Sequence, residues 1–227
     1  MPARTKRKRT TEKDAPDMVE TKTTRSLSSK LAKLPSTDED MTTTTTTMEP
    51  SEQTTAKRRY WLMKSEPESR IENGHEMKFG LDDLKSMPDQ TTHWDGVRNF
   101  EARNHMKAMR EGDLAFFYHS NCKNPGLAGI MRVCREAYVD HTQFDASDAH
   151  YDAKSDKSNP KWYMVDVKYV RDLARFVSLA EMKELHLEHK RTGGALKNLS
   201  LFTRSRLSIQ ALSEEEWNFL NELAANK

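Results

Sequence analysis

Leu114-Ala-Phe-Phe-Tyr118 decides the fold of this chain, because it is a nearly continuous apolar run without polar alternation. A strand of this kind is covered on both faces, which is the position of a central strand in a sheet. The stretch from Leu127 to Ala137, entered through the turn Asn124-Pro-Gly126, predicts a second strand. Apolar and polar residues alternate from Tyr163 to Tyr169, which predicts a third strand with one face in the core.

The remaining elements are predicted from shorter signals on either side of these strands. They are a first strand from Tyr60 to Lys64, a short helix from Leu81 to Lys85, a helix from Asn99 to Arg110 that Gly112 terminates, a short strand from Leu207 to Gln210, and two helices that follow Ser178 and Ser213. Both serines stand three residues before a glutamate, the spacing of a reciprocal capping box. The polar stretch from Asp140 to Pro160 is long for a loop, which indicates a functional or a mobile segment. This order predicts an α+β domain with a curved mixed sheet, a partly closed barrel.

The aromatic residues divide the chain near Lys57. All four Trp, six Tyr, eight Phe and eight Gly lie at or after Tyr60. Residues 1–56 therefore cannot bury enough apolar surface to offset about 1–2 kcal/mol per residue of backbone ordering entropy. We expect them to form a disordered basic and Thr-rich tail, and residues 57–227 to form one folded domain.

Residues 1–56 are interpreted as a targeting signal and a linker rather than as a folded domain. Its basic run, Arg4, Thr5, Lys6, Arg7, Lys8 and Arg9, is interpreted as a nuclear localisation signal that an import receptor binds, with a nucleic-acid patch as the alternative. The run from Thr42 to Thr47 is interpreted as a solvated linker, with phosphorylation as the alternative. Because no signal peptide and no apolar run of about 20 residues is found, we expect a soluble nuclear protein without a membrane segment.

Several kinds of chemistry lack their sequence signals. Gly-rich phosphate loops are absent, which argues against nucleotide hydrolysis and dinucleotide redox chemistry. His186 and His189 have a helical i, i+3 spacing, but a solvated surface face is the favoured interpretation over a metal site. Cys122, near His119, and Cys134, inside a predicted strand, are expected to be inert reduced thiols rather than nucleophiles. We expect no metal, no cofactor and no enzymatic activity.

Three places combine polar and aromatic residues at the ends of predicted elements. They are Lys64-Ser-Glu66, Trp94-Asp-Gly-Val-Arg-Asn99 with Arg103, and Tyr118-His-Ser120. A nucleobase is held by stacking on aromatic rings, worth about 1–3 kcal/mol per base, and its edge is read by polar side chains while Arg and Lys contact phosphates. The alternative interpretation is that Trp94 is a core tryptophan and Arg98 a salt-bridged structural residue.

The chain resembles the EVE domain family over essentially all of Tyr60 to Leu220. The signature segments are Tyr60 to Pro67, Trp94 to Asn99 with Ala102 to Asn104, Gly112 to Asn121, Ser205 to Gln210, and Trp217. The resemblance implies a PUA-like fold, an open mixed β-barrel with flanking helices, related to the YTH readers of methylated adenine. It also implies binding of modified DNA bases, 5-hydroxymethylcytosine in particular, with Lys64-Ser65 and Trp94-Asp95 similar to the YTH pocket positions.

We therefore expect a non-enzymatic, monomeric nuclear reader of nucleic acid that carries a modified base, which is flipped into an aromatic pocket. The expected pocket residues are Lys64, Ser65, Glu66, Trp94, Asp95, Gly96, Val97, Asn99, Tyr118, His119 and Ser120, and the expected phosphate contacts are Arg98, Arg103, Lys57, Arg58 and Arg59. Residues 57–227 carry a formal charge of only +1, 27 Lys and Arg against 26 Asp and Glu, so pocket contacts must supply most of the affinity. The alternatives are a modified-RNA or single-stranded RNA binder, an enzyme using Glu66 or Asp95 as general base, and a scaffold for proteins.

Overall fold

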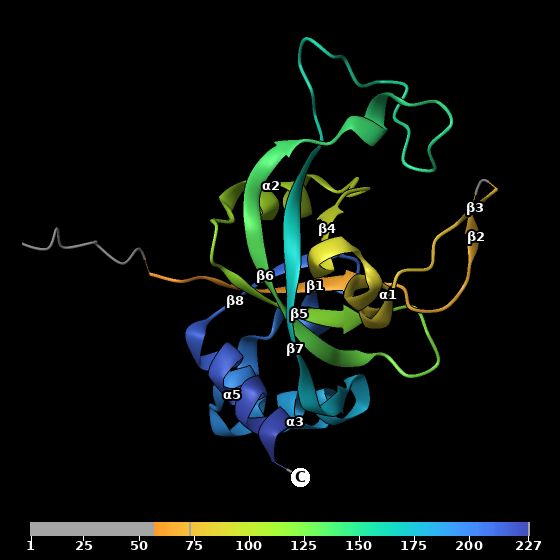
Figure 1. Ribbon diagram of the computed structural model, residues 1–227. Helices are drawn as coiled ribbons and strands as arrows, with labels where there is room; N and C mark the ends of the chain where they lie inside the picture. The colour runs from red at the N-terminus through yellow and green to blue at the C-terminus, as the bar shows by residue number, and fades with distance from the viewer. Residues whose placement is uncertain (1–56, 73, 227) are drawn as a thin grey trace, which may run out of the picture. The chain divides into compact units, whose positions relative to one another are not determined.

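The computed structural model describes residues 57–72 and 74–226, and its centre is one curved sheet (Figure 1). Six strands lie in the order β4-β7-β6-β5-β1-β8, and a separate hairpin is formed by β2 and β3. Their bounds are Tyr60–Ser65 (β1), Ile71–Glu72 (β2), His75–Glu76 (β3), Thr91–Trp94 (β4), Leu114–His119 (β5), Gly126–Val139 (β6), Tyr163–Ser178 (β7) and Ile209–Leu212 (β8). β1 and β5 are parallel and the other pairs antiparallel, so the sheet is mixed and open, as expected.

Helices cover both faces of the sheet. They are α1 (Leu81–Ser86), α2 (Phe100–Ala108), α3 (Leu179–Thr192), α4 (Ser200–Thr203) and α5 (Glu214–Ala225), with 3-10 turns η1 (Pro88–Gln90), η2 (His141–Phe144) and η3 (Ala195–Asn198). In Figure 1, α3 and α5 lie together at one end of β7, while α1 and α2 lie nearer the other end. None of the helices in the described part of the chain is long and apolar enough to cross a membrane.

The alternation of side chains along β1 and β5 creates two cores, one on each face of the sheet. Trp61, Met63 and Phe117 point into a core shared with α1 and α2. Leu62, Phe116 and Tyr118 point into the other, which the C-terminal helices cover. Because β5 contributes to both, its run of apolar residues is explained, and its predicted central position is confirmed.

Local sequence signals predicted where the helices start, but they did not predict every side-chain contact at the caps or where α2 ends. Ser213 and Glu216 form the full capping box at the start of α5. Ser178 accepts a hydrogen bond from the Glu181 amide as predicted, but the Glu181 carboxylate binds Arg175 at 2.7 Å instead of returning to the cap. Similarly, α2 ends at Ala108, before the predicted limit at Arg110. A helix end depends on the partners that tertiary packing brings, which a spacing rule does not include.

β4 and the β2–β3 hairpin are absent from the sequence prediction. Thr91-Thr92-His93-Trp94 is short and mostly polar, so it carries little strand signal of its own. It becomes a strand by antiparallel pairing with β7, where Trp94 lies opposite Val165. This pairing matters because it fixes where Trp94 and the segment after it enter the first core. The tail and its basic run from Arg4 to Arg9 lie outside the described residues.

Candidate nucleic-acid interface

Trp94 is mostly a core residue. Only 7% of it is exposed. Its ring makes edge contacts with Phe79 at 6.2 Å and with Phe117 at 5.5 Å between centroids. Val97, three residues on, is buried in the same core. The structure therefore supports the core interpretation for most of the Trp94 ring and leaves only a margin of it for a ligand.

Ser65 and His119 lie beside this aromatic group. They face each other across the parallel β1–β5 pair, on the same sheet face as Phe117. The Ser65 hydroxyl donates to the Phe79 carbonyl at 2.6 Å. The Leu81 amide donates to His119 Nε2 at 3.2 Å, and burial lowers the pKa of His119, which favours the neutral ring. Sequence reasoning missed Phe79, a lone aromatic residue in a polar stretch with no helix or strand period.

Lys64 and Tyr118 lie on the other face. Tyr118 is buried in the second core, and burial raises its pKa to about 12. The Lys64 ammonium lies 5.9 Å from the Tyr118 ring centroid and donates to the Ser205 carbonyl at 3.0 Å. The sequence interpretation places both residues in one pocket with Trp94. Strand alternation separates them from it, so we do not assign them base contacts.

Asp140 organises the segment that follows Trp94. This carboxylate is fully buried and accepts hydrogen bonds from the Gly96 amide at 3.1 Å and from Arg98 Nη1 at 2.7 Å. Its second oxygen accepts from the Thr142 amide and hydroxyl at 2.9 and 2.6 Å. Burial acts to raise the pKa of Asp140, but the hydrogen bonds from Thr142 and Arg98 outweigh it, so the pKa lies below its usual range.

His150 packs directly on Gly96. Gly96 has φ +70°, and a Cβ atom there would lie 2.6 Å from the His150 ring. Both facts require glycine at this position, since only glycine combines that backbone with so close an approach. Arg98 Nε also donates to the His150 carbonyl at 2.7 Å. The long polar loop is therefore docked on the segment from Trp94 to Asn99, although neither Asp140 nor His150 was a predicted site residue.

Asp95 is the partly open acidic group of the site. Its side chain is 28% exposed, and one oxygen lies 3.4 Å from His93 Nε2. Burial raises the pKa of Asp95; the charge of His93 opposes this shift and the neighbouring Asp140 carboxylate adds to it. The exposed part of this carboxyl group is accessible to a ligand.

Three other predicted pocket residues, Glu66, Ser120 and Asn99, make contacts that stabilise the fold. The Glu66 carboxylate binds Arg70 at 2.8 Å and accepts from Asn121 at 3.1 Å. The Ser120 amide and hydroxyl both donate to the Ser65 carbonyl, at 2.7 and 3.1 Å. Asn99 caps α2, because its side-chain oxygen accepts from two backbone amides of the first turn. Of these, Asn99 keeps an exposed amide that a ligand can reach.

The five basic residues predicted to contact phosphate lie in three different settings. Arg98 is engaged with Asp140, Thr142 and the His150 carbonyl, so its guanidinium has little left for a phosphate. Arg103 donates to the Lys161 carbonyl and to Asn104 but has no carboxylate within 4.0 Å among the described residues. A phosphate contact therefore fits Arg103 better than Arg98.

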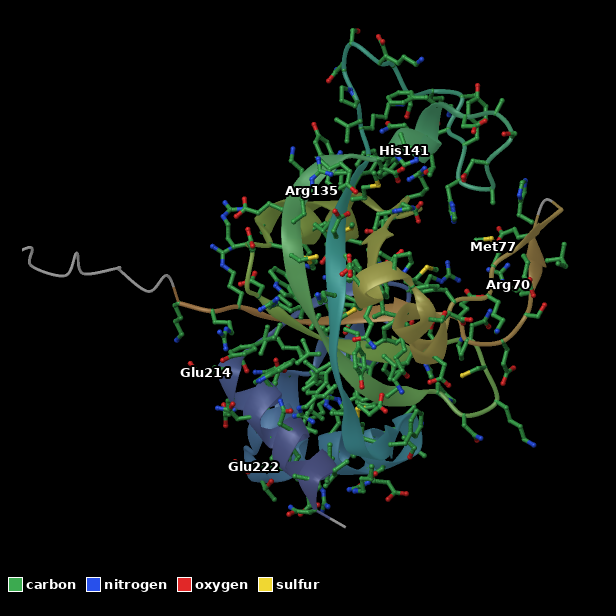
Figure 2. The ribbon with its side chains drawn as sticks, in the orientation of Figure 1. Arg70, Met77, Arg135, His141, Glu214 and Glu222 are labelled. Atoms are coloured by element: carbon green, nitrogen blue, oxygen red, sulfur yellow. The ribbon has the colours of Figure 1, made fainter. Side chains whose placement is uncertain are left out.

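Lys57, Arg58 and Arg59 lie at the opposite end of β1 from Ser65. Five residue steps of about 3.3 Å place the two ends of the strand about 17 Å apart. Lys57 pairs with Glu214 at 3.2 Å, and a hollow of about 470 Å³ is lined by this basic stretch and by β8. In Figure 2, Glu214 lies on one side of the domain and Arg70, the partner of Glu66, on the other. These three residues are thus not positioned to contact phosphates next to a base bound at Ser65.

His186 and His189 have structural roles, and the two cysteines are poor nucleophiles. His186 is only 4% exposed, and its Nδ1 lies 2.7 Å from the Leu196 carbonyl, which corrects the expected solvated face. His189 Nδ1 accepts from the Leu196 amide, so both histidines hold the turn after α3. Burial raises the pKa of Cys122 and of Cys134, which disfavours the nucleophilic thiolate. Within residues 57–72 and 74–226, no group of three or more His, Cys, Asp or Glu could hold a metal ion.

An open, mixed six-stranded sheet flanked by helices is the architecture of a PUA-like domain. The chain belongs to the EVE domain family, whose sequence profile matches residues 59–223. It is similar to the thymocyte nuclear protein 1 of Danio rerio, with 61% identity over 163 residues, 72% of this chain and 71% of that one. The Homo sapiens protein of the same name is 60% identical over 164 residues, covering 72% and 73% of the two chains.

Solved structures extend the similarity to three dimensions. A crystal structure of human THYN1 protein in complex with DNA containing 5-methylcytosine has a TM-score of 0.74 and 58% identity. The match covers 74% of this chain and 99% of that one. A crystal structure of the DUF55 domain of human thymocyte nuclear protein 1 has a TM-score of 0.73 over the same shares of the two chains. The PUA-like fold implied by the sequence is therefore confirmed.

Proposed function

We propose that this chain binds DNA that carries a modified cytosine and accepts the flipped base beside the Trp94-to-Asn99 segment. One observation carries the proposal: Asp95, the residue that follows Trp94 in the chain, presents a partly exposed carboxylate beside His93. A carboxylate accepts a hydrogen bond from the exocyclic amino group of cytosine, whereas thymine offers no donor there. The binding of 5-methylcytosine DNA by the similar human protein supports the same ligand class.

The substituent at cytosine C5 requires a different surface from the base edge. The partly exposed ring of Phe79 and the margin of Trp94 give an apolar contact for a methyl group. The Ser65 hydroxyl, which already donates to the Phe79 carbonyl, keeps lone pairs that can accept from a hydroxymethyl group. This pair of neighbours is the physical basis on which we propose 5-hydroxymethylcytosine as a ligand beside 5-methylcytosine.

The energetics require specific contacts. Taking a base out of a duplex costs a few kcal/mol, which stacking and edge contacts must offset. The small net charge of residues 57–227 gives weak non-specific attraction, and Arg103 is the best placed phosphate contact. We propose that the protein acts in the nucleus as a non-enzymatic monomer, with import directed by the basic run from Arg4 to Arg9.

Asp95→Asn is expected to reduce discrimination without destabilising the fold. The amide presents a donor as well as an acceptor, so it should lose about 1–3 kcal/mol of preference for cytosine, roughly 5-fold or more in affinity. Because burial raises the folded-state pKa of Asp95, its ionised form costs stability above that pKa, and removing the charge should not lower the melting temperature. Fluorescence anisotropy and thermal melting of the full chain measure both quantities.

The binding assay needs three matched duplexes that differ only at one cytosine, which is unmodified, 5-methylated or 5-hydroxymethylated. A further duplex with thymine at that position measures the preference for cytosine that Asp95→Asn should lose. RNA of the same sequence with the same modification tests the choice of strand type. Glu72→Gln, which removes a carboxylate on the separate hairpin, is the control and should leave the discrimination unchanged. Equal affinity of the wild-type chain for all three duplexes would refute the proposed function.

A further inference from the structure

An exposed aromatic and guanidinium cluster lies at the start of α2, outside the base site described above. Phe100, the first residue of that helix, is 58% exposed, although it is a large apolar side chain. Its ring stacks on Trp162 with 4.8 Å between centroids and 30° between planes. The Arg103 guanidinium carbon lies 4.8 Å from the Phe100 ring and 5.9 Å from the Trp162 ring.

These three separations show that Arg103 does not lie on the outer face of the Phe100 ring, the face opposite Trp162. If Arg103 lay over that outer face, its distance to the Trp162 ring would be close to the sum of the Arg103–Phe100 and Phe100–Trp162 distances. The observed 5.9 Å instead describes a triangle, with Arg103 beside the stacked pair. The high exposure of Phe100 agrees with this arrangement. The cluster therefore presents one free aromatic face, flanked by a cation.

The cluster is held in place from beneath. Trp162 is 5% exposed, and its Nε1 donates to Asp152 at 2.8 Å. Its backbone amide donates to the buried Gln143 side chain at 3.3 Å. A second guanidinium, that of Arg98, lies 5.7 Å from the Trp162 ring centroid. Phe100 thus rests on a fixed surface, and ordering it for a ligand costs little entropy.

The charges beside Phe100 fit a polyanion. Arg103 has no carboxylate within 4.0 Å in the described part of the chain, so its positive charge is not neutralised there. Lys107, one turn further along α2, is exposed and lies over Tyr163 at 4.4 Å. The nearby Glu101 is paired with Arg204. An aromatic face next to unneutralised cations is the arrangement that binds bases and phosphates of unpaired nucleic acid.

We propose that the free face of Phe100 stacks on an unpaired nucleobase of the bound strand, next to the modified one, while Arg103 contacts the adjoining phosphate. Phe100 follows Asn99 directly, so this surface adjoins the proposed base site. The inference rests on the proposed binding of nucleic acid but not on which base is discriminated. Because every base has an aromatic face, this contact adds affinity without sequence preference.

Phe100→Leu tests the proposal, since leucine keeps an apolar cover over Trp162 but has no aromatic face. We expect its affinity to fall about 5-fold or more for modified duplexes, unmodified duplexes and single-stranded oligonucleotides alike. The ratio of the affinities for modified and unmodified duplexes should stay unchanged. Phe100→Trp should bind like wild type. Leu187→Ala, which removes another exposed apolar side chain, 54% exposed on α3, is the matched control and should also bind like wild type.

Photocrosslinking gives a second readout. A 5-iodouracil placed next to the modified cytosine should attach to Phe100, as peptide mass spectrometry would show. Wild-type affinity in Phe100→Leu, or a loss of discrimination alone, would overturn the proposal. A wild-type chain that shows no discrimination, while Phe100→Leu still loses affinity, would refute the proposed function and leave the stacking surface standing. Absence of any nucleic-acid binding by wild type would refute both.

Discussion

Trp94→Ala is expected to destabilise the domain by about 3–5 kcal/mol, the usual cost of removing a large buried aromatic side chain. Trp94 is 7% exposed and packs edge-on against Phe79 and Phe117, so alanine would leave a cavity in the first core. Urea denaturation of the full chain measures the change in free energy of unfolding. Loss of DNA binding by this variant would therefore report unfolding as well as any lost contact.

Two comparisons separate these effects. Tyr151→Ala, at an aromatic residue that is 46% exposed, should change stability by no more than about 0.5 kcal/mol. Trp94→Phe keeps an aromatic ring and should lose less stability than Trp94→Ala. A cost below about 1 kcal/mol for Trp94→Ala would contradict the core position of this ring and favour an open stacking wall instead.

Asp140→Ala is the second change with a large expected effect, about 3–5 kcal/mol of stability, because it removes one partner of a buried ion pair. Asp140 is fully buried and accepts from Gly96, Arg98 and Thr142, so these donors would all lose a partner. The docked loop would lose its anchor to the Trp94-to-Asn99 segment. We therefore expect reduced thermal stability and a parallel loss of affinity for DNA.

The pH dependence gives this prediction a sign. The pKa of Asp140 in the folded state lies below its usual value, so its ionised form stabilises the fold. That contribution is fully present above the unfolded pKa, about 3.9, and is lost as the pH falls through the lower folded pKa. The stability difference between wild type and Asp140→Ala should thus shrink in acid.

The double variant Asp140→Leu/Arg98→Met should recover part of the stability that Asp140→Ala loses. No recovery would contradict pairing of the two charges.

The sequence correctly predicted the place of a strand in the sheet where the strand is apolar on both faces. β5 is apolar on both faces, so its central position could be read from Leu114 to Tyr118. The same property concealed which face each residue takes, and Tyr118 was grouped with Trp94 although the two lie in different cores. Alternating strands reveal a face by their polar residues, which a doubly buried strand lacks.

The site depends on contacts between distant residues, which spacing rules do not detect. Asp140 meets Gly96 and Arg98 across more than forty positions. Glycine at position 96 is a signal of close approach, but its partner, His150, lies in a polar loop without a periodic pattern. His186 likewise has the spacing of a helix surface and becomes buried because the turn after α3 folds back on it.

The most direct test of the central claim is a crystal structure of the full chain bound to a duplex with one 5-hydroxymethylcytosine. We expect the modified base outside the helical stack, with its amino group within hydrogen-bond distance of Asp95 and its C5 substituent between Ser65 and Phe79. A modified base that remains stacked in the duplex, or one that lies in the hollow between Lys57 and Leu212, would contradict the account.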